Sequence, residues 1–258
     1  MLNKKIKLTF LALFLLASGA HAQIGEHRND LAIGVNGGYV LSNIGFTPKV
    51  NQGMHTGFTG GVSARYVSEK YFSTICSIYA ELNYANIGWK EDIKNMDGSA
   101  FIDKTTGNPQ EYTRSLTYIQ LPVFAHLAWG REVKGCNFFL NLGPQFGFLM
   151  SESTKTNFTV TPDYEKNGYA EGRAFKHVAQ DTMKVENKFD YGIAAGIGME
   201  YSNSKLGHFL IEARYYYGLG NIYGDSKRDY FSKSNIGNIV LKATYLFDIT
   251  RTKGTNRK

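Results

Sequence analysis

The chain has 258 residues, of which 43% are hydrophobic and 14% aromatic, with 28 glycines and only 5 prolines. This composition excludes disordered and collagen-like proteins. The formal charge of +7 comes from the two ends, because residues 4–7 and 251–258 together hold seven lysines and arginines and no acidic residue. A nucleic-acid-binding face needs basic charge on the folded body, so nucleic acid is not an expected partner.

The first 22 residues have the features of a secretory signal peptide. A basic start is followed by an apolar stretch over residues 8–17 and by the small-residue site Ala20-His21-Ala22. We expect cleavage there and a mature chain that begins at Gln23. The apolar stretch is shorter than the roughly 20 residues of a transmembrane helix, and no later segment reaches that length. An exported chain without a helical anchor is expected in the periplasm, outside the cell or in the outer membrane.

Hydrophobic residues between Leu31 and Phe247 recur with period two, which favours strands over helices. One face of each run is apolar and the other is small or polar. The runs are longer than ordinary soluble strands and match the roughly 9 to 11 residues of a tilted membrane strand. Their apolar faces tend to end in aromatic residues, as expected at the two membrane interfaces. The eight runs are residues 31–39, 57–66, 77–84, 118–129, 138–148, 189–201, 209–219 and 238–247.

The connections between these runs alternate in length. Long connections are expected at residues 42–56, 91–114, 151–187 and 220–234, and short polar turns at 68–73, 130–135 and 202–205. Short turns at one end and long loops at the other are typical of outer-membrane barrels, in which the loops face outward. A closed barrel also satisfies every backbone polar group in lipid.

The sequence therefore predicts an all-β fold, an eight-stranded antiparallel up-and-down transmembrane β-barrel preceded by a cleaved signal peptide. The barrel domain is expected over residues 23–248, with a short basic periplasmic tail over 249–258. We expect a monomeric barrel in the outer membrane of a Gram-negative bacterium, in contact with outer-membrane lipid. Cys76 and Cys136 are too few for a disulfide framework, and with one strand between them they are not expected to be bridged.

Four segments carry a resemblance to a known family. The chain resembles PorT-like outer-membrane β-barrel proteins in residues 118–124 (YIQLPVF), 141–149 (NLGPQFGFL), 192–201 (GIAAGIGMEY) and 215–220 (YYYGLG). The resemblance spans nearly the whole mature chain. It implies an eight-stranded barrel of Gram-negative outer membranes, and the founding members of the family are linked to the type IX secretion pathway.

Six charged residues lie at the strand positions that alternate with the apolar ones, and they are expected in the barrel lumen. Three are acidic and three are basic, so they are expected to pair and to form a structural plug, because an isolated buried charge is costly. A pair of carboxylates for acid/base catalysis is the alternative. The six residues are Arg65, Glu81, Glu200, Glu212, Arg214 and Lys242.

No cofactor, metal or catalytic site is expected. The glycine clusters lie inside runs that continue to alternate, whereas a dinucleotide-binding glycine loop must open a helix. No histidine has the spacing of a zinc site. We therefore expect a non-enzymatic envelope structural or protein-secretion-associated factor whose long loops contact partners. The loop over 151–187 is the best candidate, with Tyr164, Tyr169, Arg173, Phe175 and Lys176 as candidate contact residues.

Two alternatives remain: a lipid-modifying barrel enzyme, which would need a His, Ser or Asp cluster at the outer rim, and a small-ligand-binding barrel. A porin is not expected, because side chains fill the interior of an eight-stranded barrel.

Overall fold

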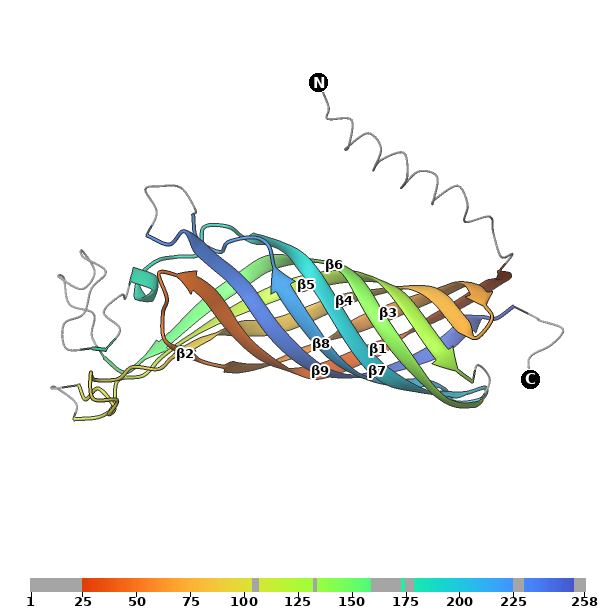
Figure 1. Ribbon diagram of the computed structural model, residues 1–258, viewed down its shortest axis with the longest axis horizontal. Helices are drawn as coiled ribbons and strands as arrows, with labels where there is room; N and C mark the ends of the chain where they lie inside the picture. The colour runs from red at the N-terminus through yellow and green to blue at the C-terminus, as the bar shows by residue number, and fades with distance from the viewer. Residues whose placement is uncertain are drawn as a thin grey trace, which may run out of the picture.

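A single antiparallel sheet closes on itself to form the protein (Figure 1). The computed structural model describes residues 25–103, 107–131, 134–158, 173–174, 179–224 and 230–252. Its elements are β1 (Glu26–Thr47), β2 (Gln52–Gly53), β3 (His55–Tyr71), β4 (Thr74–Glu91), β5 (Tyr112–Gly130), β6 (Lys134–Thr156), the 3₁₀ turn η1 (Ala179–Asp181), β7 (Phe189–Asn203), β8 (Gly207–Gly218) and β9 (Lys233–Thr250).

Eight long strands, among the described residues, make a closed ring. Each pairs with its neighbours along the chain, and the ring closes where β1 pairs with β9. The strand β2 adds only two residues to the edge of β4. The predicted eight-stranded up-and-down barrel is therefore confirmed. In this part of the chain no helix is long and apolar enough to cross a membrane.

The two faces of the sheet differ as the period-two pattern predicts. Outward side chains in the middle of the barrel are apolar and exposed, as at Ile197 (66%) and Ile211 (71%). Inward side chains are buried and mostly polar or small, with aromatic rings such as Phe124 and Phe139 among them. Aromatic residues form two belts on the outer surface. The belt near the long loops holds Tyr39, Phe58, Tyr84, Phe146, Phe148, Phe189, Tyr191, Tyr215 and Tyr217, and the belt near the short turns holds Trp129, Phe138, Tyr201, Phe209, Tyr245 and Phe247.

The spacing of the belts matches a membrane. Tyr191 and Tyr201 lie in opposite belts, ten residues apart on β7. At about 3.3 Å per residue and a tilt of about 40°, the belts are separated by about 25 Å along the membrane normal, which is the height of the apolar band of outer-membrane barrels. We call the end with the short turns, where β1 begins and β9 ends, the inner end, and the end with the long loops the outer end (Figure 1).

The strands extend further beyond the outer belt than predicted. β1 runs to Thr47 and β3 begins at His55, so the connection between them spans residues 48–54 and the expected long loop over 42–56 is wrong. The other three long connections are confirmed, although the strands also take residues from their ends. They span residues 92–111, 157–188 and 219–232.

The strands are longer than predicted because their alternating pattern of apolar and polar residues inverts toward the outer end. Below Tyr39 the apolar residues of β1 face outward, whereas above it Ile44 and Phe46 are buried inside and Asn43 is exposed outside. The same change occurs on β4, where Trp89 is fully buried and Lys90 is exposed. Beyond the membrane the outer surface meets water, so the hydrophobic side chains turn to the interior.

The structure also bears on the C-terminal end of the barrel and on the two cysteines. The expected signal peptide lies outside the described residues. The strand β9 continues to Thr250, so the first two residues of the expected basic tail belong to the barrel. Cys76 and Cys136 are both free thiols, on β4 and β6 with β5 between them, and the expected absence of a bridge is confirmed.

Candidate functional site

The lumen of the inner half holds a cluster of four charged side chains from β4, β8 and β9. Arg214 binds the Glu81 carboxylate through both Nη atoms, at 2.8 and 3.0 Å, and binds Glu212 through Nε and Nη2, at 2.9 and 2.7 Å. Lys242 Nζ donates to Glu81 Oε2 at 2.6 Å. The Arg214 guanidinium also lies 4.4 Å from the centre of the Phe124 ring. Two cations therefore neutralise two anions, and all four side chains are buried.

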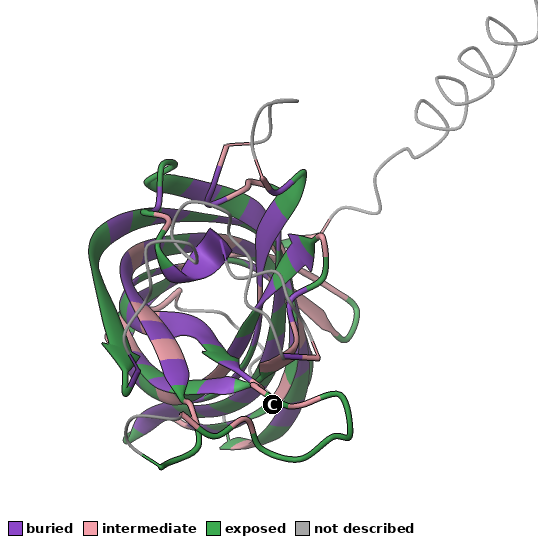
Figure 2. Cartoon of the chain, turned by 90° about the vertical axis from the view of Figure 1, so that its left-hand side faces the viewer, coloured by how far each residue is buried: buried purple, intermediate pink, exposed green. Residues whose placement is uncertain are grey.

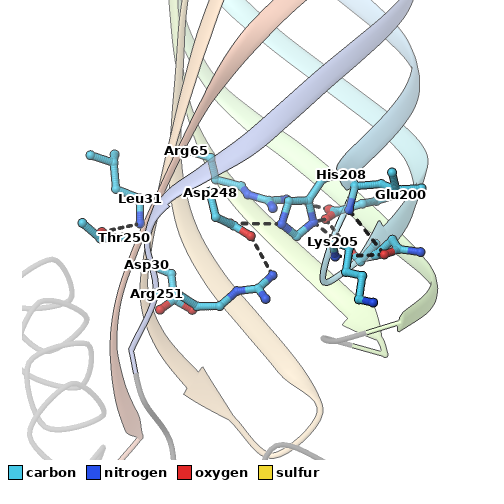
Figure 3. A network of polar contacts seen from close by, with 12 residues as sticks. Asp30, Leu31, Arg65, Glu200, Lys205, His208, Asp248, Thr250 and Arg251 are labelled. Carbon is cyan, nitrogen blue, oxygen red and sulfur yellow. Dashed lines mark hydrogen bonds and ion pairs between the residues drawn. The ribbon is translucent and has the colours of Figure 1, made fainter.

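A second charged cluster lies closer to the inner mouth, where Figure 3 shows it. Arg65 Nη1 donates to Glu200 Oε2 at 2.6 Å. His208 lies between two carboxylates, with Nδ1 2.6 Å from Glu200 Oε1 and Nε2 3.2 Å from Asp248 Oδ1. Arg251 Nη2 pairs with Asp248 Oδ2 at 2.6 Å. The sequence placed Arg65 and Glu200 in the lumen but did not assign roles to His208 or Asp248.

All six charges expected in the lumen are thus buried, and they divide into the two clusters. Arg65 pairs with Glu200, and Glu81, Glu212, Arg214 and Lys242 form the other group. The two clusters are joined through Asn141 and His126, and His126 Nε2 lies 4.0 Å from Glu200 Oε2. Asn141 Nδ2 donates to Glu212 Oε1 at 3.0 Å, and His126 Nδ1 lies 2.7 Å from Asn141 Oδ1.

One contact near the inner mouth resembles catalytic geometry. Ser202 Oγ lies 2.9 Å from His208 Nδ1, whose other nitrogen faces Asp248. A triad needs a histidine nitrogen with a free lone pair toward the serine. Here both ring nitrogens face carboxylates, so both carry protons and donate. The imidazolium is a cationic bridge between Glu200 and Asp248, and Ser202 Oγ donates to Glu200 Oε1 at 2.9 Å. This arrangement holds the strands together and does not activate the serine.

The lumen of the outer half is filled mainly by aromatic side chains, with the buried Arg114 and Glu91 beside them. Trp89 is fully buried, with its ring 5.4 Å from that of Phe46 in an edge contact and 6.4 Å from that of Tyr112. Tyr223 and Phe231, from the connection between β8 and β9, stack at 5.7 Å. We call these five aromatic residues the outer plug. The inverted alternation on β1 and β4 is the sequence signal that could have revealed it.

The turn η1 covers the outer plug on the side that faces the outer loops. Figure 2 looks onto the loop end and shows η1 inside the outline of the barrel. The Gln180 carbonyl accepts from the hydroxyls of Tyr112 and Tyr223, each at 3.4 Å. Burial raises the pKa of the Tyr223 hydroxyl, which therefore stays protonated and donates. Gln180 Nε2 also donates to Glu91 Oε1 at 2.8 Å. Part of the longest loop thus folds inward and packs on the barrel.

This packing corrects one of the expected contact residues. Arg173 is 3% exposed, with Nη2 2.7 Å from Gln110 Oε1 and the guanidinium 5.0 Å from the Phe158 ring. It anchors the loop to the barrel and is not available to a partner. The prediction failed because an arginine among polar residues gives no sign of the buried aromatic ring that covers it. The other four expected contact residues, Tyr164, Tyr169, Phe175 and Lys176, lie outside the described residues.

A histidine–serine contact lies at the outer rim. His55 Nε2 is 3.0 Å from Ser115 Oγ, and His55 is buried. His55 Nδ1 has no hydrogen-bond partner among the described residues. A serine nucleophile needs a base that is itself oriented by a third group, and no described carboxylate supplies it here. Nor do three or more His, Cys, Asp or Glu side chains come together as a metal site in the described part of the chain.

The closed sheet, the two aromatic belts and the filled lumen define a small outer-membrane β-barrel. A family model for the outer membrane protein beta-barrel domain matches residues 21–224. The chain belongs to this family and lies in the outer membrane of a Gram-negative bacterium. No curated protein matches it.

Three solved structures illustrate its similarity to small outer-membrane proteins. The attachment invasion locus protein Ail of Yersinia pestis is 13% identical, with 86% of this chain and 99% of that chain covered and a TM-score of 0.34. Neisserial surface protein A is 10% identical, with 84% and 97% covered and a TM-score of 0.39. The outer membrane protein OprG from Pseudomonas aeruginosa is 11% identical, with 86% and 98% covered and a TM-score of 0.37.

Proposed function

We propose that the protein is a non-enzymatic envelope factor whose outer loops contact other proteins. The observation that carries this proposal is the filled lumen. Ion pairs occupy its inner half, and the outer plug with η1 occupies its outer half. A lumen closed in this way favours neither passage of solutes nor entry of a lipid substrate. The outer loops are the surface at the outer end that can recognise other proteins.

The connection between β4 and β5 offers such a surface. Residues 94–100 of this connection form a small hairpin, in which Lys94 and Ala100 make an antiparallel β-bridge and Asn95 N donates to Ser99 O at 2.8 Å. Met96 at its tip is 77% exposed, and Ile102 is 46% exposed. Methionine is common at surfaces that bind several partners, because its flexible side chain adapts to them. The resemblance to PorT-like barrels supports secretion-associated proteins as the partners.

Photo-crosslinking in intact cells tests the proposal. A photo-reactive residue at Met96 is expected to give a discrete protein adduct, because this tip projects from the outer end. The same residue at Phe72, which is 80% exposed in the inner turn between β3 and β4, is the matched control and is expected not to give that adduct. Replacing Ile102 by serine should reduce the yield from position 96. Failure to form any adduct at Met96 would contradict the proposed role of the hairpin.

A lipid-modifying enzyme is the second candidate, and the contact between His55 and Ser115 is the observation that favours it. The pair lies at the outer end of the barrel, on β3 and β5. If it is catalytic, purified protein in detergent should release or transfer acyl chains from outer-membrane lipid, and Ser115→Ala should abolish this activity with no change in thermal stability. We expect no such activity, since His55 Nδ1 has no described carboxylate to orient it.

A further inference from the structure

A polar cavity of about 50 Å³ lies at the inner mouth of the barrel, between the second charged cluster and the periplasm. All eight long strands contribute to its lining. It has room for roughly three to four water molecules. The rim includes the partly exposed residues Asp30, Lys70 and Arg251. The cavity therefore faces the periplasm, and it lies at the opposite end of the molecule from the outer loops.

The two walls of the cavity differ in how their polar groups are paired. On the wall formed by β7, β8 and β9, the side chains of Glu200, His208 and Asp248 bond one another. On the opposite wall, four consecutive strands each present one buried polar atom without a hydrogen-bond partner among the described residues. These atoms are Arg65 Nε on β3, Ser77 Oγ on β4, His126 Nε2 on β5 and Asn137 Oδ1 on β6. Their residues are 5%, 7%, 0% and 2% exposed, respectively.

Two of these four atoms are hydrogen-bond acceptors. Glu212 can only accept, so the Asn141 amide nitrogen faces it and the Asn141 oxygen faces His126 Nδ1. His126 Nδ1 therefore carries the proton, and in the neutral ring Nε2 presents a lone pair to the cavity. Asn137 Nδ2 faces Ser202 Oγ at 3.5 Å, which leaves Asn137 Oδ1 as the second acceptor.

The other two atoms are donors, because Arg65 Nε carries a hydrogen and the Ser77 hydroxyl is free to donate. The lining also holds four Lys and Arg side chains against three Asp and Glu, before the His208 imidazolium is counted. Most of these cations are already paired, as Arg28 is with Glu26 at 2.8 Å, so it is the two donor atoms, Arg65 Nε and Ser77 Oγ, that favour an anionic group. Water from the periplasm can reach these atoms, so a ligand gains affinity by replacing those hydrogen bonds with better-placed ones of its own.

We propose that this cavity binds an α-amino carboxylate group from the periplasm, carried either by a free amino acid or by the C-terminus of a peptide chain. The carboxylate accepts hydrogen bonds from Arg65 Nε and Ser77 Oγ. The adjacent nitrogen of the ligand donates to His126 Nε2, which lies 4.0 Å from Glu200 Oε2. A carboxylate, its α-carbon and one nitrogen take about the space of the three to four waters that the cavity accommodates. The site is independent of the proposed role of the outer loops.

Titration of the folded, purified barrel with small probes tests the proposal. Glycine represents a free amino acid and N-acetylglycine represents a peptide C-terminus, whereas acetate lacks the nitrogen and methylamine lacks the carboxylate. Binding is followed by calorimetry and by the side-chain ¹⁵N signals of His126. We expect glycine or N-acetylglycine to bind and to shift the Nε2 signal, with acetate and methylamine clearly weaker. The tighter of the first two identifies the source of the group.

Ser77→Ala is the decisive variant, because Ser77 Oγ has no described partner whose loss could unfold the barrel. Losing one hydrogen bond to a carboxylate should weaken binding about tenfold. Ser63→Ala is the matched control, since Ser63 is a buried lumen serine on β3 that bonds Asn36 and does not line the cavity. The proposal is overturned if no probe binds, if acetate or methylamine binds as tightly as the two full probes, or if both serine variants weaken binding equally.

Discussion

Replacing Arg214 with methionine is expected to lower the free energy of unfolding by about 3–5 kcal/mol, the usual cost of breaking a buried ion pair by removing one partner. Arg214 makes four hydrogen bonds to Glu81 and Glu212. Methionine keeps much of the side-chain volume but leaves two carboxylates with a single nearby ammonium group, that of Lys242. The barrel should remain folded at low temperature and lose its compact form at a lower temperature than the wild type. Heat-dependent gel mobility and urea unfolding in lipid vesicles measure the change.

Arg251→Met is the matched control for this prediction. Arg251 also forms an ion pair at 2.6 Å, but its side chain is 30% exposed and that of Asp248 is 21% exposed. Ion pairs open to solvent contribute about 0–1 kcal/mol. We therefore expect a much smaller loss of stability. If Arg214→Met and Arg251→Met destabilised the barrel equally, the charged clusters would not act as the structural plug of the lumen.

The sequence was sufficient to predict the barrel because a strand in a membrane has only two environments. Lipid requires an apolar side chain on every second residue, and the narrow lumen requires a small or polar one between. The run from Phe189 to Tyr201 follows this rule without interruption and appears in the structure as β7, with Asn203 as its last residue. The positions of Glu81 and Arg214 in this alternation were therefore enough to place each in the lumen.

The partners of these charges could not be predicted from the same pattern. Arg65 and Glu200 are 135 positions apart in the chain, and Glu81 is 133 positions from Arg214. The alternation shows on which face of the sheet a residue lies. Its position along the barrel axis depends on the register of every intervening strand pair. Two of these pairs, β3–β4 and β5–β6, contain irregularities that shift the register. Which cation meets which anion depends on the registers of all the strand pairs together.

The outer plug was missed for a different reason. Its residues follow a period of two, but in the opposite phase to the membrane part of the same strands. Phe46 was placed inside the expected loop over 42–56, and Trp89 beyond the end of the run over 77–84, because a change of phase looks like the end of a strand. The two phases have one physical origin, since apolar side chains turn away from water in both and only the position of the water changes. A barrel that extends beyond its membrane must show this inversion.

The outer plug leads to the second large expected effect, that of Trp89→Ala. Trp89 is fully buried and contacts the rings of Phe46 and Tyr112, with the Arg114 guanidinium 5.8 Å from its ring centre. Removing a buried aromatic side chain leaves a cavity and costs about 3–5 kcal/mol. We expect a loss of this size in the free energy of unfolding, together with faster proteolysis of the connection between β8 and β9, because Tyr223 and Phe231 lose the surface on which they pack.

Trp129 is the matched control, since the chain has only two tryptophans. Trp129 lies in the inner aromatic belt, 39% exposed, with its indole nitrogen 2.8 Å from Thr74 Oγ1. Trp129→Ala removes an interfacial ring without opening a hole in the interior, so its effect on unfolding should be smaller and the outer loops should stay protected from protease. Because each variant retains a single tryptophan, its fluorescence reports which end of the barrel opens first. Equal loss of stability in both variants, with no change in loop proteolysis, would show that the outer plug does not hold the loops on the barrel.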